Sequence, residues 1–202
     1  MNRFRFALLA VALVVGLVAT ASFASPLRHD KRAATGQRFG WYIISFDFAN
    51  NSFKAGGIAS ASAADGSKIT ISNSQGTFGG KPTNVTGGGS WKTLDPSGKE
   101  TGSGTFKVTS LVYYVGAPGL LLSTITDNIG NPADARAGVG VLKVSFSDGK
   151  QGILIVTCRL PVGSPPWISE KILMTKGNVD YTKGETPVAG VDANRNQFRV
   201  VK

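Results

Sequence analysis

The strongest constraint on the fold is the segment 138–160, where two runs of apolar and β-branched residues flank an Asp-Gly pair. Asp148-Gly149 between such runs is typical of a two-residue type I′ hairpin turn, because both central positions of that turn need a positive φ. The sequence therefore predicts an antiparallel hairpin in which Ser147 lies opposite Lys150.

The predicted register gives this hairpin two apolar faces, with Val144 opposite Ile153. One face carries Leu142, Val144, Phe146, Ile153 and Ile155, and the other carries Val139, Val141, Leu154, Val156 and Cys158. A hairpin at the edge of a sheet normally exposes one face to water. We therefore expect this hairpin in the middle of a sheet, with a core on one side and a covering segment on the other.

A strand with alternating side chains is predicted at residues 38–48. Tyr42, Ile44, Phe46 and Phe48 share one side of this strand, and we expect that side to face the core. The alanine-rich stretch that follows contains two adjacent glycines, each of which costs a helix about 1 kcal/mol relative to alanine. We therefore expect strands in that stretch as well.

A second hairpin is predicted over residues 85–107, with a four-residue turn of sequence DPSG. Its pairing sets Trp91 opposite Gly102 and Phe106 opposite Gly87. Large rings over glycines are typical of strongly curved sheets, because the concave face has little room for side chains. The sequence therefore predicts an all-β protein built as a single antiparallel β-barrel, with a β-sandwich as the alternative.

The first 24 residues have the parts of a secretory signal peptide: a basic head, an apolar run and small residues before the cleavage point. The apolar run is about 15 residues, shorter than the roughly 20 of a membrane span. Residues 25–32 end in a dibasic pair, which predicts a propeptide or linker, and 33–202 are expected to form a single domain. The sequence thus predicts a secreted protein with no membrane span after cleavage. Asn50 and Asn84 are glycosylation acceptors if the producing cell is eukaryotic, and both are expected at turns.

Loss of residues 1–32 also changes the charge of the protein. The whole chain carries 22 basic and 12 acidic side chains, a net charge of +10. The lost segment holds five of the basic residues and one of the acidic ones, which leaves 17 and 11, a net charge of +6. The remaining lysines are scattered singly, whereas nucleic-acid binding needs basic residues clustered on one face. We therefore predict no nucleic-acid partner.

The chain lacks the side chains of several common catalytic sites. Its single histidine, His29, lies in the segment expected to be lost, so a serine or cysteine triad and a histidine-ligated metal are excluded. Its single cysteine, Cys158, is predicted to be a small buried hydrophobe. The Asp-x-Asn-x-Asn spacing at 192–196 lacks the glycine and the glutamate of a calcium loop, so we predict no metal and no cofactor.

Two classes of function remain open. The first is a non-catalytic extracellular binding or interaction protein. The second is an extracellular hydrolase with paired carboxylates, for which the candidate acids are Asp47, Glu100, Asp127, Asp134 and Glu170. Two of these acids close together in a cleft would favour the hydrolase, whereas an apolar cavity would favour binding of a small molecule.

The candidate binding residues are three aromatic side chains and part of a long loop. Residues 116–137 are rich in turn formers around an apolar patch, and loops of this length are often lids or binding loops. We expect this loop to fold over the second face of the 138–160 hairpin or across an adjacent barrel end. The expected ligand is an apolar small molecule, with an extracellular protein as the alternative partner. The predicted lining residues are Trp41, Trp91, Tyr114, Leu120, Leu121 and Leu122.

The segments VTGGGSW, GSGTFKVT and TCRLP, the last followed by PPW, resemble an uncharacterised family of small secreted all-β proteins. This resemblance covers the middle and C-terminal parts of the chain and implies the all-β fold, but it implies no catalytic residues. Gly40-Trp41-Tyr42 also resembles, one residue short, the start of the first lipocalin strand. The second resemblance implies a small-ligand carrier, although the cysteine pattern differs from that of lipocalins.

Overall fold

The computed structural model describes residues 36–185 and 194–202. These residues belong to one compact unit, Arg32–Lys202. The predicted signal peptide at 1–24 and the predicted propeptide or linker at 25–32 lie outside the described residues. Within the described part of the chain, no helix has the length and apolar character needed to cross a membrane.

The described residues form strands joined by turns and one short 3-10 turn, so the all-β prediction is confirmed. The strands are β1 (Arg38–Asp47), β2 (Ser52–Ala55), β3 (Ile58–Ser62), β4 (Lys68–Gly79), β5 (Lys81–Leu94), β6 (Glu100–Ala117), β7 (Thr126–Asp127), β8 (Ala135–Phe146), β9 (Gln151–Cys158), β10 (Lys171–Lys176), β11 (Val179–Tyr181), β12 (Lys183–Gly184) and β13 (Arg195–Val201), and the 3-10 turn is η1 (Pro132–Asp134). The alanine-rich stretch is split between β2 and β3, as strands rather than a helix.

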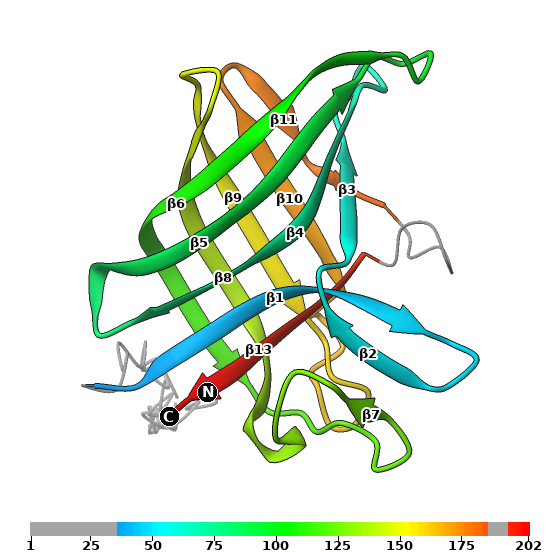
Figure 1. The fold of residues 1–202 in the computed structure, drawn as a ribbon, viewed down its shortest axis with the longest axis vertical. Helices are drawn as coiled ribbons and strands as arrows, with labels where there is room; N and C mark the ends of the chain where they lie inside the picture. The colour runs from blue at the N-terminus through cyan, green and yellow to red at the C-terminus, as the bar shows by residue number, and fades with distance from the viewer. Residues whose placement is uncertain (1–35, 186–193) are drawn as a thin grey trace, which may run out of the picture. The chain divides into compact units, whose positions relative to one another are not determined.

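The strands form one mixed, mostly antiparallel sheet in the order β11-β10-β9-β8-β6-β5-β4-β1-β2-β7 (Figure 1). The β2–β7 pair is parallel. The last strand, β13, pairs with β1 over seven residue pairs and with β8 at Phe198 and Arg199. Neighbouring strands are therefore hydrogen-bonded in a circuit from β8 through β6, β5, β4 and β1 to β13. The last pair of the circuit, β13 with β8, covers only two residues of β13, so the ring of hydrogen bonds is partial.

The predicted hairpin at 138–160 is present as β8 and β9, but its predicted register is wrong by one residue. Val144 lies opposite Gly152, not Ile153. The backbone of Phe146 pairs with that of Lys150, so the loop has three residues and only its last, Gly149, has a positive φ, of 84°. Asp-Gly suits this three-residue loop as well as the two-residue turn, and the local sequence does not distinguish them.

The slip changes which residues share a face of the sheet. Leu142 pairs with Leu154, and these two side chains are fully buried in the core together with Val144 and Val156. Val139, Val141, Ile153 and Ile155 lie on the other face and are half-buried. The hairpin is central, as expected, because β6 pairs with β8 and β10 pairs with β9.

The predicted hairpin at 85–107 forms as β5 and β6, with a register two residues away from the predicted one. Trp91 lies opposite Gly104 and Phe106 opposite Gly89. A slip of two residues keeps side chains on the same face, so each ring still faces a glycine. A Cβ atom at Gly104 would lie 3.1 Å from Trp91 Nε1. The aromatic-over-glycine arrangement is therefore confirmed for Trp91, whereas the atom nearest to a Cβ at Gly89 is Ser74 Oγ.

The predicted core face of the first strand is wrong. Trp41 and Ile43 are fully buried and belong to the main core cluster, whereas Phe46 is half-buried and Phe48 is 47% exposed. In β1, alternate residues point to opposite faces of the sheet. Ile44 and Phe46 therefore face away from the main core, and the pocket described next lies on their side.

Candidate functional site

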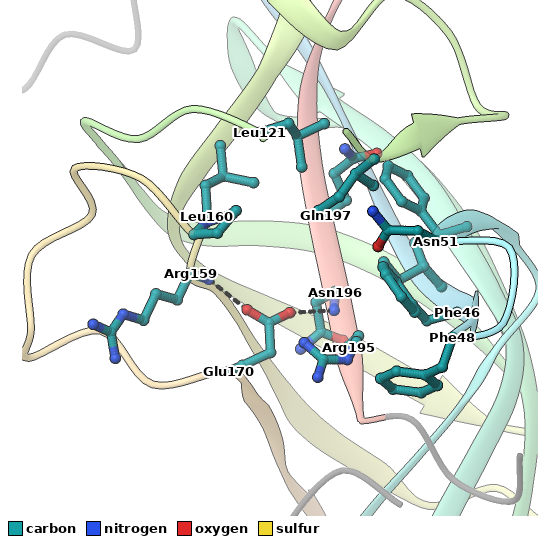
Figure 2. A pocket seen from close by; sticks show the side chains of 14 residues that line it. Phe46, Phe48, Asn51, Leu121, Arg159, Leu160, Glu170, Arg195, Asn196 and Gln197 are labelled. Atoms are coloured by element: carbon teal, nitrogen blue, oxygen red, sulfur yellow. Dashed lines mark hydrogen bonds between the residues drawn. The ribbon is translucent and has the colours of Figure 1, made fainter. Parts of the chain in front are cut away.

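A pocket of about 460 Å³ lies where β1, β2 and β13 meet the loops that follow β6 and β9 (Figure 2). Eight of its lining residues are apolar: Ile44, Phe46, Phe48, Phe53, Leu121, Ile125, Leu160 and Pro161. The polar lining residues are Asn51, Arg159, Glu170, Arg195, Asn196 and Gln197. The pocket therefore has apolar walls and a group of polar residues, half of which belong to β13.

One wall comes from the aromatic end of β1 and from β2. Phe46 lies opposite Phe53 in the β1–β2 pair, with 6.4 Å between the ring centroids. The ring of Phe48 lies 4.8 Å from that of Phe46. The alternating apolar pattern that suggested a core-facing strand instead supplies this wall.

A second wall comes from the loop between β6 and β8, which supplies Leu121 and Ile125. This loop is held at β7, where the side chain of Asp127 is fully buried and forms an ion pair with Arg199 on β13. Asp127 Oδ1 also accepts the backbone N–H groups of Ile129 and Gly130. A buried carboxylate with these partners fixes the loop against β2 and β13.

The carboxyl group of Glu170 lies at the pocket wall and accepts two backbone hydrogen bonds. The N–H of Arg159 donates to Oε2 at 2.5 Å, and the N–H of Asn196 donates to Oε1 (Figure 2). Burial raises the pKa of Glu170 to about 8 from an ordinary value of 4.5, against the opposing effects of these N–H groups and of Arg195. Glu170 is therefore mostly protonated at neutral pH.

Arg195 is the charged group next to the aromatic wall. Its guanidinium carbon lies 5.4 Å from the ring centroid of Phe46 and 5.5 Å from that of Phe48. Cations over aromatic faces at this distance are attracted by the ring quadrupole. Arg195 Nε is buried and has no hydrogen-bond partner among the described residues.

Two neighbouring amide side chains also carry unpartnered atoms. Asn196 and Gln197 are 3% and 1% exposed. Asn196 Oδ1 and Gln197 Oε1 are buried, and neither accepts a hydrogen bond from any part of the chain that the structure describes. Unpaired buried polar atoms are uncommon in folded proteins, and each costs about 1 to 3 kcal/mol. Three consecutive residues that line one pocket each carry such an atom.

The structure brings only one of the six predicted lining residues to this pocket, Leu121. Trp41 and Trp91 are buried in the main core. Tyr114 packs against the rings of Phe39, Phe78 and Phe198 at 4.7 to 5.2 Å. Leu120 and Leu122 are 67% and 45% exposed. Alternation along the loop explains this split, because the middle leucine points inward and its neighbours point to solvent.

The candidate acids are dispersed. Glu170 lines the pocket, and Asp127 is bonded to Arg199. Asp47 and Glu100 are exposed, and Asp134 lies in η1. Among the described residues, no group of three acidic, cysteine or histidine side chains could hold a metal ion.

Asn50 and Asn84, the two glycosylation acceptors, are exposed. Asn50 lies in a turn, as expected, and its amide nitrogen donates to Asp47. Asn84 lies within β5 rather than at a turn.

No protein-family model, no curated protein and no solved structure matches this chain.

Proposed function

We propose that this chain is a binding protein that holds a small amphipathic molecule in the pocket between β1, β2, β13 and the loop before β8. One observation carries the proposal: a pocket of about 460 Å³ has eight apolar lining residues and, beside them, the polar residues Arg195 and Glu170. A ligand with an apolar body and a polar head covers the apolar walls and places its head beside these two residues.

The dimensions of the pocket support the same function. Small-molecule sites in proteins are mostly apolar concavities of about 300 to 1,000 Å³ with a few polar groups that fix orientation. A volume of about 460 Å³ falls in this range. Its walls come from segments far apart in the chain that are tied together by the Asp127–Arg199 ion pair, so the pocket is formed before a ligand arrives.

The hydrolase is less well supported. Glycoside hydrolysis needs two carboxyl groups on either side of the bond to be cleaved. Glu170 is the only carboxyl group among the described lining residues of this pocket. A raised pKa suits a general acid, but a partner base is needed as well.

We further propose that the partial ring of strands is a closed β-barrel and that the protein is secreted. The six-strand circuit through β8, β6, β5, β4, β1 and β13 supports closure, and the glycines opposite Trp91 and Phe106 suit a strongly curved sheet. The proposal of secretion rests on residues 1–24, whose sequence has the parts of a secretory signal peptide. A secreted barrel that carries a small ligand is also what the lipocalin resemblance implies.

The test is a titration of the purified protein with N-phenyl-1-naphthylamine, a neutral amphipathic dye that fluoresces in apolar surroundings. We expect a saturable increase in fluorescence. Leu121→Trp should abolish it, because the larger side chain fills the pocket, whereas Leu122→Trp should leave it intact, because Leu122 is exposed and does not line the pocket. No increase with the folded wild type, or equal loss in both variants, would overturn the proposed function.

A further inference from the structure

We infer that the ligand of this pocket is a carboxylate with an apolar body, whose head group pairs with the guanidinium group of Arg195 beside the carboxyl group of Glu170. This inference rests on the proposed function and names the ligand class for the same pocket. Its basis is an uncompensated positive charge at an apolar wall.

The guanidinium group of Arg195 is a pocket-lining cation without a counter-ion. Arg195 is half-buried, and its side chain forms no ion pair and no hydrogen bond with any residue that the structure describes. Only its Nε atom is fully buried, so the two Nη atoms are the ones that a ligand can reach. Arg199, on the same strand, is by contrast paired with Asp127. Arg195 therefore has a free charge where Arg199 does not.

This charge lies beside the aromatic wall of the pocket. The guanidinium carbon is 5.4 Å from the ring centroid of Phe46 and 5.5 Å from that of Phe48. Apolar walls lower the local dielectric constant, which strengthens an ion pair formed next to them. A carboxylate on Arg195 therefore leaves its apolar chain next to the two rings.

Glu170 lies near Arg195 at the same wall and offers a proton instead of a second negative charge. Figure 2 shows the two side chains as neighbours, and the charge of Arg195 acts on the pKa of Glu170. Burial raises that pKa to about 8, so the group is mostly protonated at neutral pH. A protonated carboxyl group has one O–H to donate, and a ligand carboxylate is an acceptor for it.

The charges of the described lining residues favour an anion over the alternatives. Arg159, Arg195 and Glu170 are the only charged or titratable residues among them, so with Glu170 protonated the lining carries positive charge alone. Figure 2 shows Arg159 directed away from the phenylalanine wall, which leaves Arg195 as the partner of the head group. An ester would leave Arg195 unpaired, and an ammonium group would add a second cation beside it. A carboxylate is therefore the matching head group.

The experiment compares three probes that share an apolar chain: octanoate, methyl octanoate and octylamine. Isothermal titration at pH 6.5 keeps octanoate ionised and octylamine protonated. We expect octanoate to bind at least about tenfold more tightly than either of the others, because hydrogen bonds between charged groups are the strong ones. Equal or tighter binding of methyl octanoate or octylamine would overturn the inference.

A variant assigns the preference to Arg195. Arg195→Met should weaken octanoate binding about tenfold and leave methyl octanoate binding almost unchanged, since the ester makes no ion pair to lose. Arg195→Lys keeps the charge and should restore part of the preference. Arg38→Met is the matched control, because Arg38 is exposed, lies at the other end of β1 and is outside the pocket. A preference for octanoate that survives in Arg195→Met as in Arg38→Met would overturn the assignment.

A pH series tests the part played by Glu170. Its carboxyl group is protonated below about pH 8 and ionised above, where it repels a bound carboxylate. The nearby charges of Arg159 and Arg195 do not titrate in this range, and burial raises the pKa of the neighbouring Cys158 thiol. Octanoate binding should therefore weaken severalfold between pH 6.5 and 9.5, whereas methyl octanoate binding should not change. Octanoate affinity that stays constant over this range would overturn the placement of the head group beside Glu170.

Failure of the inference and failure of the proposed function give different results. The probe ranking and the pH series use the wild type alone, so both remain decisive if Arg195→Met fails to fold. Binding of N-phenyl-1-naphthylamine with no preference for octanoate would overturn only the inference. Failure of the dye and of all three probes to bind would overturn the proposed function, and with it the inference.

Discussion

Replacing Arg199 by methionine tests whether the loop between β6 and β8 is held in place by a buried ion pair. Arg199 Nη1 donates to Asp127 Oδ1 at 3.2 Å, and Nη2 donates to the carbonyl oxygen of Asn131 at 2.6 Å. The Asp127 side chain is fully buried and that of Arg199 is 6% exposed. Methionine keeps much of the buried chain but removes the donors, so the Asp127 carboxylate loses its countercharge.

Removal of one partner from a buried ion pair costs about 3 to 5 kcal/mol, because the other charge remains buried and uncompensated. With a dependence of about 2 kcal/mol per molar urea, the unfolding midpoint of Arg199→Met should fall by about 2 M. Asp127→Asn in the same background should recover part of this loss, because it removes the uncompensated charge and keeps an acceptor. Urea denaturation followed by tryptophan fluorescence measures all three proteins.

The matched control is Lys202→Met, just beyond the end of the same strand. Lys202 is exposed, and its pair with Asp134 should contribute less than about 1 kcal/mol. If the urea midpoint of Arg199→Met falls no further than that of Lys202→Met, the claim that the Asp127–Arg199 ion pair holds the loop is refuted. Unchanged hydrogen exchange at the amides of Ile129 and Gly130, which donate to Asp127, would refute it independently.

Three further predictions concern a turn, a titration and a thiol. Gly149→Val should destabilise the protein by about 1 to 2 kcal/mol, because φ is 84° at this position, and Gly149→Asn should destabilise it less. No atom lies within 4 Å of the added Cβ, so backbone strain is the expected cause of the loss. Equal melting temperatures for Gly149→Val and the wild type would refute this strain. The folded protein holds the Glu170 proton more tightly than the unfolded chain, so the contribution of Glu170 to the free energy of unfolding is fully present below about pH 4.5 and is lost as the pH rises to about 8, a slope that Glu170→Met should remove. Persistence of the slope in that variant would assign it to another group. Cys158 is fully buried and burial raises its pKa, so iodoacetamide should modify it only after denaturation; rapid labelling of the native protein, read by mass spectrometry, would contradict its burial.

Local sequence patterns predict the strands and hairpins of this protein but not their registers. Alternation and Asp-Gly pairs locate β8 and β9 correctly, yet Asp148-Gly149 closes a three-residue loop where a two-residue turn was expected. The difference comes from burial: the observed register places Leu154 in the core, a long-range effect that no local motif encodes. The face of β1 was wrongly predicted for a related reason, since the more apolar face of this strand packs in the pocket.

The candidate site was predictable only in part. Leu121 and the acid Glu170 were singled out, the first as a lining residue and the second as one of several dispersed acids. Arg195 and Gln197 were not, and Asn196 was considered only as part of the 192–196 spacing that lacks the features of a calcium loop. Their importance depends on β13 pairing with β1, which sets Arg195 opposite Ile44 across a separation of about 150 residues. Unpaired donors and acceptors of this kind become visible only when every partner has been placed.

The most direct test of the central claim is an isotope-filtered NOE measurement on the protein with N-phenyl-1-naphthylamine bound. The account predicts contacts from the aromatic protons of the dye to the methyl groups of Leu121 and Ile125, which line the pocket. Contacts confined to exposed apolar side chains such as Leu120 and Leu122, with none to Leu121 or Ile125, would contradict it.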